Sequence, residues 1–377
     1  MALAWAAMAA VRFEHVSKQY VPDVYALAGL NLGIESGEIV SIVGPSGCGK
    51  TTALRILAGL ETATYGHVMI DDEVVDNVPT HSRGLGMVTQ DNALLRHRTT
   101  ARNISMPLEL RRTVDGRTVD EVVAEIADDL AIGHLLRRKP AQLSGGEIQA
   151  VQIARALISL PRVWLLDEPM ARLDRSLRLD LRGDIRRLQR FHDVTTLLVT
   201  ADQNDASVLS DRIAMLLDGR LQQVDTPSGM LATPVNMAVA RFFGEPTMNF
   251  LTARVSGSDR ARHYHLLGMD LPAWPEVTDR FLGRDIVVGI RPHELRTRAE
   301  VPGAPTVVGR VDDVSHFGSH CVARVDTEPG QRFEWMVVKS TPRPGDRVEL
   351  VLEPDRFHLF DPLTEAAVHH PTPLGLR

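Results

Sequence analysis

The chain has 377 residues, of which 44% are hydrophobic, and a formal net charge of −6 at pH 7. Because this length exceeds that of most single domains, two domains are expected, and the negative charge argues against nucleic-acid binding. No apolar run approaches the roughly 18–20 residues that span a bilayer, so a role at a membrane requires a partner. Two cysteines, Cys48 and Cys321, suggest no disulfide framework and favour a reducing cytosol.

The first ten residues, MALAWAAMAA, are apolar but short, and they contain no basic segment. A secretory signal peptide carries such a segment before its apolar region. We therefore interpret residues 1–10 as an N-terminal extension and expect the first domain to span residues 11–235.

A nucleotide-binding loop is predicted at residues 44–51. An apolar strand over residues 38–43 leads into the turn GPSGCGKT and a helix follows, so the pattern G-x-x-x-x-G-K-[ST] stands in its proper context. The glycines let backbone N–H groups surround the β- and γ-phosphates, Lys50 supplies a positive charge, and Thr51 can bind Mg²⁺. A chance match in a glycine-rich loop is the less favoured alternative. The predicted nucleotide-binding residues are Gly44, Pro45, Ser46, Gly47, Cys48, Gly49, Lys50, Thr51 and Thr52.

A second part of the same site is predicted where the apolar run 163–166 ends in Asp167 and Glu168. Such a run is typical of a buried parallel strand, and the carboxyl end of such a strand is where an α/β sheet places its chemistry. Asp167 is expected to hold Mg²⁺, and Glu168 to orient the attacking water or accept its proton. Two solvated acids would be the better interpretation without the phosphate-binding loop. With it, the first domain is predicted to be an α/β P-loop NTPase.

Between these two parts lies LSGGE, followed by the helical segment IQAVQIARAL. With the P-loop and the Asp-Glu strand in this order, the chain resembles the ATP-binding-cassette (ABC) ATPases, whose signature reads LSGGQ. The resemblance implies that the signature binds the γ-phosphate held by the P-loop of a second subunit, in a homodimer or a heterodimer with two composite ATP sites. The residues that carry this role are Leu143, Ser144, Gly145, Gly146 and Glu147, of which Glu147 departs slightly from the family pattern.

The resemblance assigns further roles by position. Tyr20 matches the aromatic residue that stacks on adenine, although a tyrosine at a strand edge is an equally good interpretation of the residue alone. Gln90 matches the glutamine that contacts Mg²⁺ or water and faces the membrane partner. Asp174 matches the D-loop aspartate at the dimer interface, and Ala171 replaces a serine that is common in that loop.

A mostly helical segment is predicted over residues 92–158, and it carries the signature. Within it, the stretch VDEVVAEIADDLAIGHLL has apolar residues at helical spacing. We interpret this stripe as core and not as a ligand site. Its members are Val122, Val123, Ile126, Leu130, Ile132 and Leu135.

In the family, the strand after the D-loop helix ends in a switch histidine, and here that position holds Ala201. Losing one positioned polar group of this kind is expected to slow hydrolysis by roughly 10²–10³-fold, with less effect on ATP binding. His192 precedes the strand and is expected to point elsewhere. Three explanations remain open: an introduced substitution, a naturally slow or regulatory ATPase, or compensation by another residue.

After residue 236, short strand-like segments alternate with glycine and proline turns, which predicts a small all-β barrel such as an OB-fold over residues 236–377. FFGEPTMNFL, VGIRPHEL and FHLFDPLTEAA also resemble the C-terminal domain of carbohydrate-importer ATPases. This domain is expected either to bind a soluble regulatory protein or to strengthen the dimer.

The resemblance therefore implies an ATP-binding and hydrolysing subunit of a sugar or glycerol-phosphate importer, with ATP and Mg²⁺ as cofactors. Its partners would be two transmembrane permease subunits and an external substrate-binding protein, at the cytoplasmic face of the membrane. The alternative is a slow or non-hydrolysing regulator that dimerises with ATP.

Overall fold

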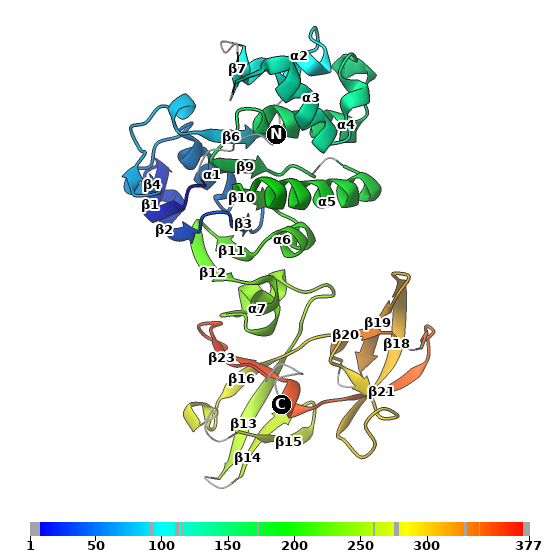
Figure 1. Ribbon diagram of the computed structural model, residues 1–377. Coiled ribbons are helices and arrows are strands. Elements are labelled where there is room, and N and C mark those ends of the chain that lie inside the picture. Colours follow the sequence, from blue (N-terminus) through cyan, green and yellow to red (C-terminus); the bar gives the residue numbers. More distant parts are fainter. Residues whose placement is uncertain are drawn as a thin grey trace. The chain divides into compact units, whose positions relative to one another are not determined.

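The computed structural model describes residues 8–90, 94–109, 113–114, 116–171, 173–258, 261–274, 279–327, 330–338 and 340–371. Residues 1–7 of the predicted extension lie outside these ranges. The chain forms two compact units, Met1–Pro227 and Ser228–Arg377 (Figure 1). The first unit ends before the predicted boundary near residue 235, because Arg291 of the second unit donates a hydrogen bond to the carbonyl of Leu231.

A six-stranded sheet forms the centre of the first unit, and all neighbouring strands in it are parallel except β11 and β12. Strands β3, β9 and β10 are composed entirely of buried residues, as is typical of parallel strands with both faces of the sheet covered. In spatial order the strands are β12 (Arg220–Asp225), β11 (Arg212–Leu217), β3 (Ile39–Val43), β10 (Thr195–Thr200), β9 (Val163–Asp167) and β6 (Leu85–Val88).

Helices cover both faces of this sheet. Alternate side chains of β9 enter different cores, with Trp164 on one face and Val163 on the other. The Trp164 core includes side chains of α4 (Gly145–Leu157) and α5 (Arg175–His192), and the Val163 core includes those of α1 (Lys50–Ala58). The two-sided burial explains why apolar residues predominate in β3 and β9.

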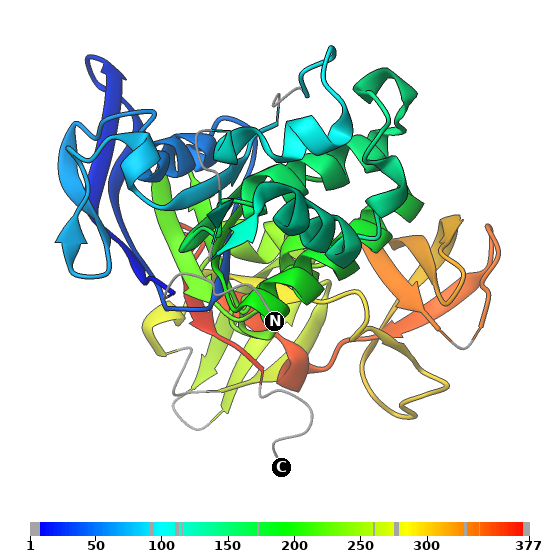
Figure 2. The same cartoon turned by 45° about the horizontal axis from the view of Figure 1, so that its top comes forward.

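An antiparallel sheet also packs against the core of α1. Its strands, in spatial order, are β2 (Val24–Ile34), β1 (Val11–Val21), β4 (Tyr65–Ile70) and β5 (Glu73–Val74). In two views, these strands and the helical segment coloured cyan to teal lie at separate ends of the first unit (Figures 1 and 2).

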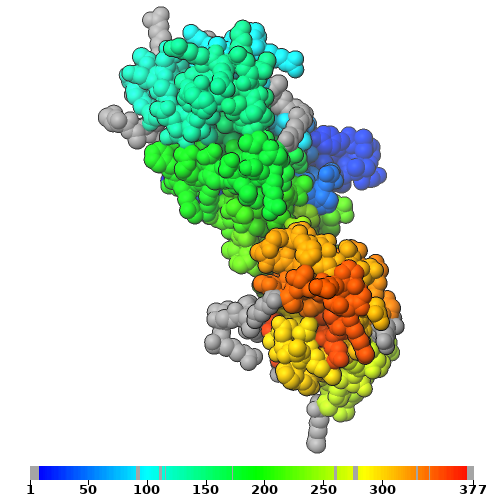
Figure 3. All heavy atoms as spheres, turned by 90° about the vertical axis from the view of Figure 1, so that its right-hand side faces the viewer, coloured from blue at the N-terminus to red at the C-terminus, as the bar shows by residue number. Residues whose placement is uncertain are grey.

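The helical segment contains α2 (Thr100–Ile104), α3 (Val119–Asp129) and the first part of α4, with a short hairpin of β7 (Thr113–Val114) and β8 (Arg117–Thr118) before α3. The predicted apolar stripe is confirmed as core, since all six of its residues are buried there. Its last three members follow the end of α3 at Asp129, where the backbone turns left-handed at Ala131 (φ 55°). In the space-filling view, teal atoms of this segment adjoin the green atoms of the central part of the unit (Figure 3).

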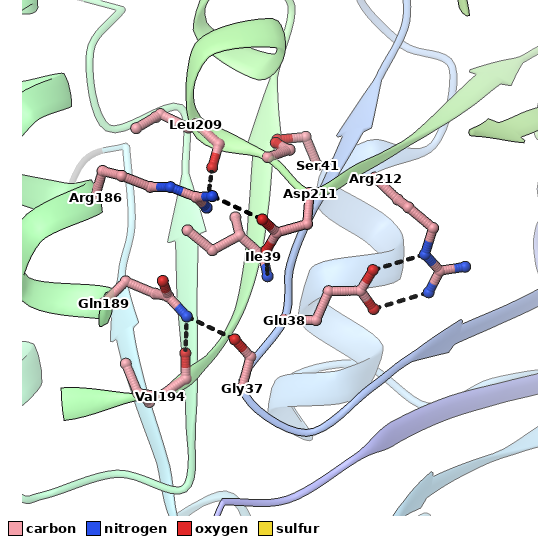
Figure 4. Close-up of polar contacts among 11 residues, drawn as sticks. Gly37, Glu38, Ile39, Ser41, Arg186, Gln189, Val194, Leu209, Asp211 and Arg212 are labelled. Atoms are coloured by element: carbon pink, nitrogen blue, oxygen red, sulfur yellow. Dashed lines mark hydrogen bonds and ion pairs between the residues drawn. The ribbon is translucent and has the colours of Figure 1, made fainter. Parts of the chain in front are cut away.

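Polar side chains hold together the amino-terminal ends of the central strands (Figure 4). Arg212 pairs with Glu38 through two hydrogen bonds of 2.6 and 2.8 Å. The Asp211 carboxylate accepts the backbone N–H of Ile39 at 2.9 Å and also pairs with Arg186 at 2.7 Å. These contacts anchor β3 and β11 at the edge opposite to the predicted site.

The second unit is an all-β domain preceded by α7 (Pro227–Ala232) and α8 (Met237–Phe242), which confirms the predicted fold class. Its two antiparallel sheets share one hydrophobic core. The first contains β15 (Met269–Ala273), β14 (Ala261–Leu266), β13 (Asn249–Ser258), β16 (Asp285–Ile290), β22 (His358–Phe360) and β23 (Ala367–His369). The second contains β17 (Arg296–Thr297), β21 (Arg347–Val351), β18 (Thr306–His316), β19 (Cys321–Thr327) and β20 (Arg332–Val337).

A histidine pair in the second unit makes its stability sensitive to acid. The Nδ1 atoms of His358 and His370 lie 2.9 Å apart, so one must donate and the other accept. Burial, assisted by Arg291, lowers the pKa of His358 from 6.5 to about 3, and burial lowers the pKa of His370 to about 4. Because the folded pKa values lie below the unfolded value, their stability contribution is complete above pH 6.5 and is lost as the pH falls toward 4.

We therefore expect the unfolding temperature of the second unit to fall between pH 6.5 and pH 4, followed by calorimetry on the full chain. His358→Gln removes one titrating group and should make this decline shallower. His316→Gln, at an exposed position of the same unit, should leave the slope unchanged. Equal slopes for all three proteins would contradict this account.

Candidate nucleotide site

The P-loop follows β3 and passes so close to other backbone that two of its glycines are required. Gly44 has φ 147° and Gly49 has φ 106°, both in the range that favours glycine. A Cβ on Gly44 would lie 2.1 Å from the carbonyl oxygen of Leu216, and one on Gly49 would lie 2.2 Å from that of Ala26. The loop therefore holds its shape only with glycine at both positions.

We expect Gly44→Ala to lower the unfolding temperature of the first unit much more than Gly47→Ala. Gly47 also has a positive φ of 82°, but no atom lies within 4 Å of the position of its Cβ. Gly47→Ala should therefore show only the backbone strain of about 1–2 kcal/mol, whereas Gly44→Ala adds a clash with fixed backbone. Similar losses for the two variants, measured by calorimetry, would contradict the close approach.

Lys50 begins α1 and its ammonium group lies within the P-loop. Its side chain is buried, and Nζ donates to the carbonyl oxygens of Gly44 at 2.9 Å and Pro45 at 3.0 Å. A phosphate oxygen forms a stronger, charge-assisted bond than a carbonyl does. The free N–H groups at the start of α1 add positive potential at the same place.

Thr51 and Asp167 come from different elements and meet beside the P-loop. Thr51 Oγ1 donates to Asp167 Oδ1 at 3.2 Å. Burial raises the pKa of Asp167 above its ordinary value, and the hydrogen bond from Thr51 opposes this shift. A buried carboxylate beside a hydroxyl fits Mg²⁺, a hard cation that binds oxygen and usually takes its other ligands from phosphates and water. In the part of the chain that the structure describes, no three His, Cys, Asp or Glu side chains gather as a metal cluster.

Glu168 and Gln90 also meet at this edge of the sheet. Gln90 Nε2 donates to Glu168 Oε2 at 3.3 Å, and Glu168 N donates to the carbonyl of Val199 at 2.8 Å. Glu168 has φ 47°, a left-handed conformation that is uncommon for a residue other than glycine. Backbone strain of this kind concentrates at functional sites. The conformation brings the carboxylate to the amide of Gln90, which follows β6.

Ala201 stands directly after β10 at the same edge. In the parallel ladders Thr200 pairs with Val43, at the end of the P-loop strand, and Val199 pairs with Asp167. The residue after Thr200 is thus placed between the P-loop and the Asp-Glu strand end, and its alanine side chain is exposed. No polar side-chain atom is available from this position.

His192 lies at the other end of β10 and cannot supply the missing imidazole. It ends α5, is buried, and its Nε2 lies 3.3 Å from Asp129 Oδ2. Burial lowers the pKa of His192 to about 4. The imidazole is therefore a neutral group in the core.

The signature begins α4, and its glutamate has a structural role within the same turn. Ser144 is the N-cap and accepts from the backbone N–H of Glu147 at 3.3 Å, while Glu147 Oε2 accepts from the N–H of Ser144 at 2.7 Å. Glutamate and glutamine serve equally in such a capping box. The departure from LSGGQ therefore preserves the start of the helix, where Ser144 and Gly145 are exposed.

The remaining predicted residues lie at element ends. Asp174 is the N-cap of α5 and accepts from the N–H of Leu177 at 3.0 Å. Tyr20, near the end of β1, is 55% exposed, and Lys18 Nζ lies 5.1 Å from the centre of its ring. Arg178 was not among the predicted site residues, yet it donates to Asp202, the residue next to Ala201, at 2.6 Å. The repetition of arginine every fourth residue in α5 was a signal of this contact.

The P-loop and the strand that ends in Asp167 and Glu168 belong to one sheet with helices on both faces. The helix that begins with LSGGE lies in the attached helical segment. Together these features define an ATP-binding domain of the ABC class. The sequence model of the family described as ABC transporter matches residues 27–171, and that of the TOBE domain matches residues 288–360. By both domains and by the relatives described next, the chain belongs to the ATP-binding subunits of ABC importers of the carbohydrate type, which are ATPases coupled to transport.

The relatives match nearly the whole chain. The trehalose/maltose import ATP-binding protein MalK of Thermococcus litoralis is 37% identical over 373 residues, which cover 96% of this chain and 100% of that protein. The sulfoquinovosyl glycerol transport ATP-binding protein SmoE of Agrobacterium fabrum is 37% identical over 363 residues, with the same coverage. A dimeric ATP-binding cassette in a post-hydrolysis state, bound to ADP and Pi, matches 58% of this chain and 98% of its own with a TM-score of 0.52 and 33% identity.

Within the described ranges, no helix is both long and apolar enough to cross a membrane.

Proposed function

We propose that the chain binds and hydrolyses MgATP to power an importer of sugars or glycerol-phosphate-like solutes. The main support is the strand register, which brings the P-loop, Asp167 and Ala201 to one edge of the sheet. The names of the relatives, which import or transport carbohydrates and related solutes, support the substrate class.

Each predicted site residue has a proposed task. Lys50 and the P-loop N–H groups bind the β- and γ-phosphates, and Tyr20 stacks on adenine. Thr51 and Asp167 would hold Mg²⁺, which neutralises charge that develops on the phosphates. Glu168 orients the attacking water and takes its proton, while Gln90, which follows β6, holds the Glu168 carboxylate.

The functional unit in this proposal is a dimer that closes on two ATP molecules at the cytoplasmic face of the membrane. The exposed start of α4, at Ser144, would meet the γ-phosphate bound by the other subunit. Asp174 would face the same interface. Closure would act on two permease subunits through the surface near Gln90, an external binding protein would deliver the solute, and the second unit would bind a regulator or strengthen the dimer.

One observation favours a second candidate, an ATP-dependent dimerising regulator that hydrolyses slowly or not at all. Ala201 offers neither a donor nor a charge at the place where the family has histidine. Since Lys50, Thr51 and Asp167 are all in place, ATP binding would persist while chemistry slows.

Hydrolysis of MgATP by the chain assembled with its permease subunits tests the proposal, together with ATP-driven dimerisation measured by light scattering. We expect both activities, and we expect Lys50→Ala to abolish both. Arg254→Ala, which removes a positive charge at an exposed place in the second unit, should change neither. Dimerisation without measurable hydrolysis would favour the regulator, and the absence of both would contradict the two candidates.

A further inference from the structure

Three arginines on one face of α5 pair with acidic residues directly before, within and after α6 (Gln203–Leu209). They occupy positions 178, 182 and 186, and residues spaced by four lie on the same face of a helix. We call these three ion pairs the arginine ladder. Its pairs are Arg178–Asp202, Arg182–Asp205 and Arg186–Asp211.

The Arg182–Asp205 and Arg186–Asp211 pairs hold α5 against α6 and the residues that follow α6. Arg182 donates from Nε to Asp205 at 2.7 Å, and this pair is the most buried of the three, with side chains 12% and 4% exposed. Arg186 donates to the carbonyl of Leu209 and to Asp211 (Figure 4). Asp205 lies in the first turn of α6 and Asp211 lies after its end, so neither of these acidic residues is adjacent to Ala201.

The Arg178–Asp202 pair differs because each partner lies beside a loop of the proposed site. The Asp202 carboxylate follows Ala201 directly and caps α6, accepting from the N–H groups of Asn204 at 2.8 Å and Asp205 at 3.4 Å. Arg178 lies one turn after the D-loop aspartate, and its backbone N–H donates to the carbonyl of Asp174 at 3.0 Å. One side chain therefore links the proposed dimer contact to the switch position.

The guanidinium of Arg178 also retains an unused donor. Its Nη1 binds Asp202 at 2.6 Å, while its Nε is buried without a hydrogen-bond partner among the residues described. A buried donor without a partner is unfavourable and calls for an explanation. A small movement of the two loops on dimer closure would give this donor an acceptor, whereas no nitrogen of Arg182 is buried without a partner in the described part of the chain.

We propose that Arg178 is a positioning residue that couples the D-loop at Asp174 to the switch position at Ala201 by holding the Asp202 carboxylate. This inference rests on the proposed function, since only a dimer that closes with ATP makes Asp174 an interface residue. When the subunits close, movement of Asp174 passes through the first turn of α5 and Arg178 to the start of α6. The loop between Thr200 and Asp202 is then held beside the γ-phosphate.

The test uses the full chain with Glu168→Gln, so that ATP is bound and not consumed. Amide hydrogen exchange of a peptide containing Asn204 and Asp205 is measured with and without MgATP, alongside dimerisation. We expect MgATP to slow exchange at these amides by about tenfold or more, because closure stabilises the cap. The Arg178→Lys variant should still dimerise but lose this slowing of exchange. Lysine replaces the planar guanidinium and its several donors with one compact ammonium group.

Arg186→Lys is the matched control, with the same substitution on the same face of the same helix. It should retain the slowing with MgATP. If Arg178→Lys also retains it, or if the parent chain dimerises without any slowing at these amides, the coupling is absent and the inference is wrong. If the parent chain does not dimerise with MgATP, the proposed function itself is contradicted, and the inference falls with it.

A second readout separates positioning from packing. With Glu168 restored and the permease subunits present, Arg178→Lys should lower kcat by about tenfold with little change in KM, since misplacing a loop beside the reacting atoms affects the transition state more than ATP binding. Arg186→Lys should change kcat by less than about twofold on the same reasoning. If the two substitutions change kcat equally, Arg178 has only the packing role of the other arginines of the ladder, and the inference is wrong.

Discussion

We expect Ala201→His to raise the rate of MgATP hydrolysis by about 10²-fold or more in the chain assembled with its permease subunits. The reason is the register of β10, which places residue 201 between the P-loop and the strand that ends in Asp167. An imidazole there would contact the γ-phosphate and orient the attacking water beside Glu168. Steady-state phosphate release is the measurement, and the KM for ATP should change little because the P-loop contacts remain.

Two further variants decide whether the gain comes from the imidazole. Ala201→Leu adds volume without a donor and should leave the rate as it is. The gain from histidine should also disappear when Glu168→Gln is added, because the imidazole acts on water that Glu168 holds. If the unaltered chain already hydrolyses ATP rapidly and histidine adds nothing, another group performs this task and the account of Ala201 is wrong.

We expect Glu168→Gln to lower kcat by about 10²–10⁴-fold, the range for loss of a general base. The loss is measured best in the Ala201→His chain, where the starting rate is higher. Glutamine keeps the size of the side chain and a carbonyl acceptor for Gln90, but it cannot take a proton from water. ATP-driven dimerisation should therefore persist and the dimer should become longer-lived.

Glu147→Gln is the matched control, since it makes the same chemical change in the signature. Its effect on kcat should be small, because glutamine can replace glutamate in the capping box with Ser144. If Glu168→Gln retains most of the rate, or if Glu147→Gln causes a comparable loss, the assignment of the general base to Glu168 is wrong.

Much of the first unit could be predicted from the sequence because its signals are local. The glycines of the P-loop, the apolar run before it and the acidic pair after residue 166 each specify a turn or a strand within a few residues. The all-β class of the second unit could also be predicted, because glycine and proline turns separate its short strands. The end of α3 was less predictable, because the left-handed turn at Ala131 interrupts a pattern that continues to look helical.

Contacts between distant elements could not be predicted in this way. The hydrogen bond between Thr51 and Asp167 joins residues 116 positions apart, and the Arg178–Asp202 pair depends on how α5 packs against α6. The histidine pair at His358 and His370 likewise requires β23 to pair beside β22. None of these partners can be read from spacing alone, because each depends on register and packing.

By itself, the sequence determined the class of the protein, the position of its phosphate-binding loop and the absence of a histidine at residue 201, since these depend on residue identity and short-range pattern. Only the tertiary structure decided that Ala201 stands between the P-loop and Asp167, that His192 is buried at the other end of β10, and that Arg178 connects Asp174 to Asp202. The physical reason is that a side chain acts through its neighbours in space, and strand register and helix packing place those neighbours together.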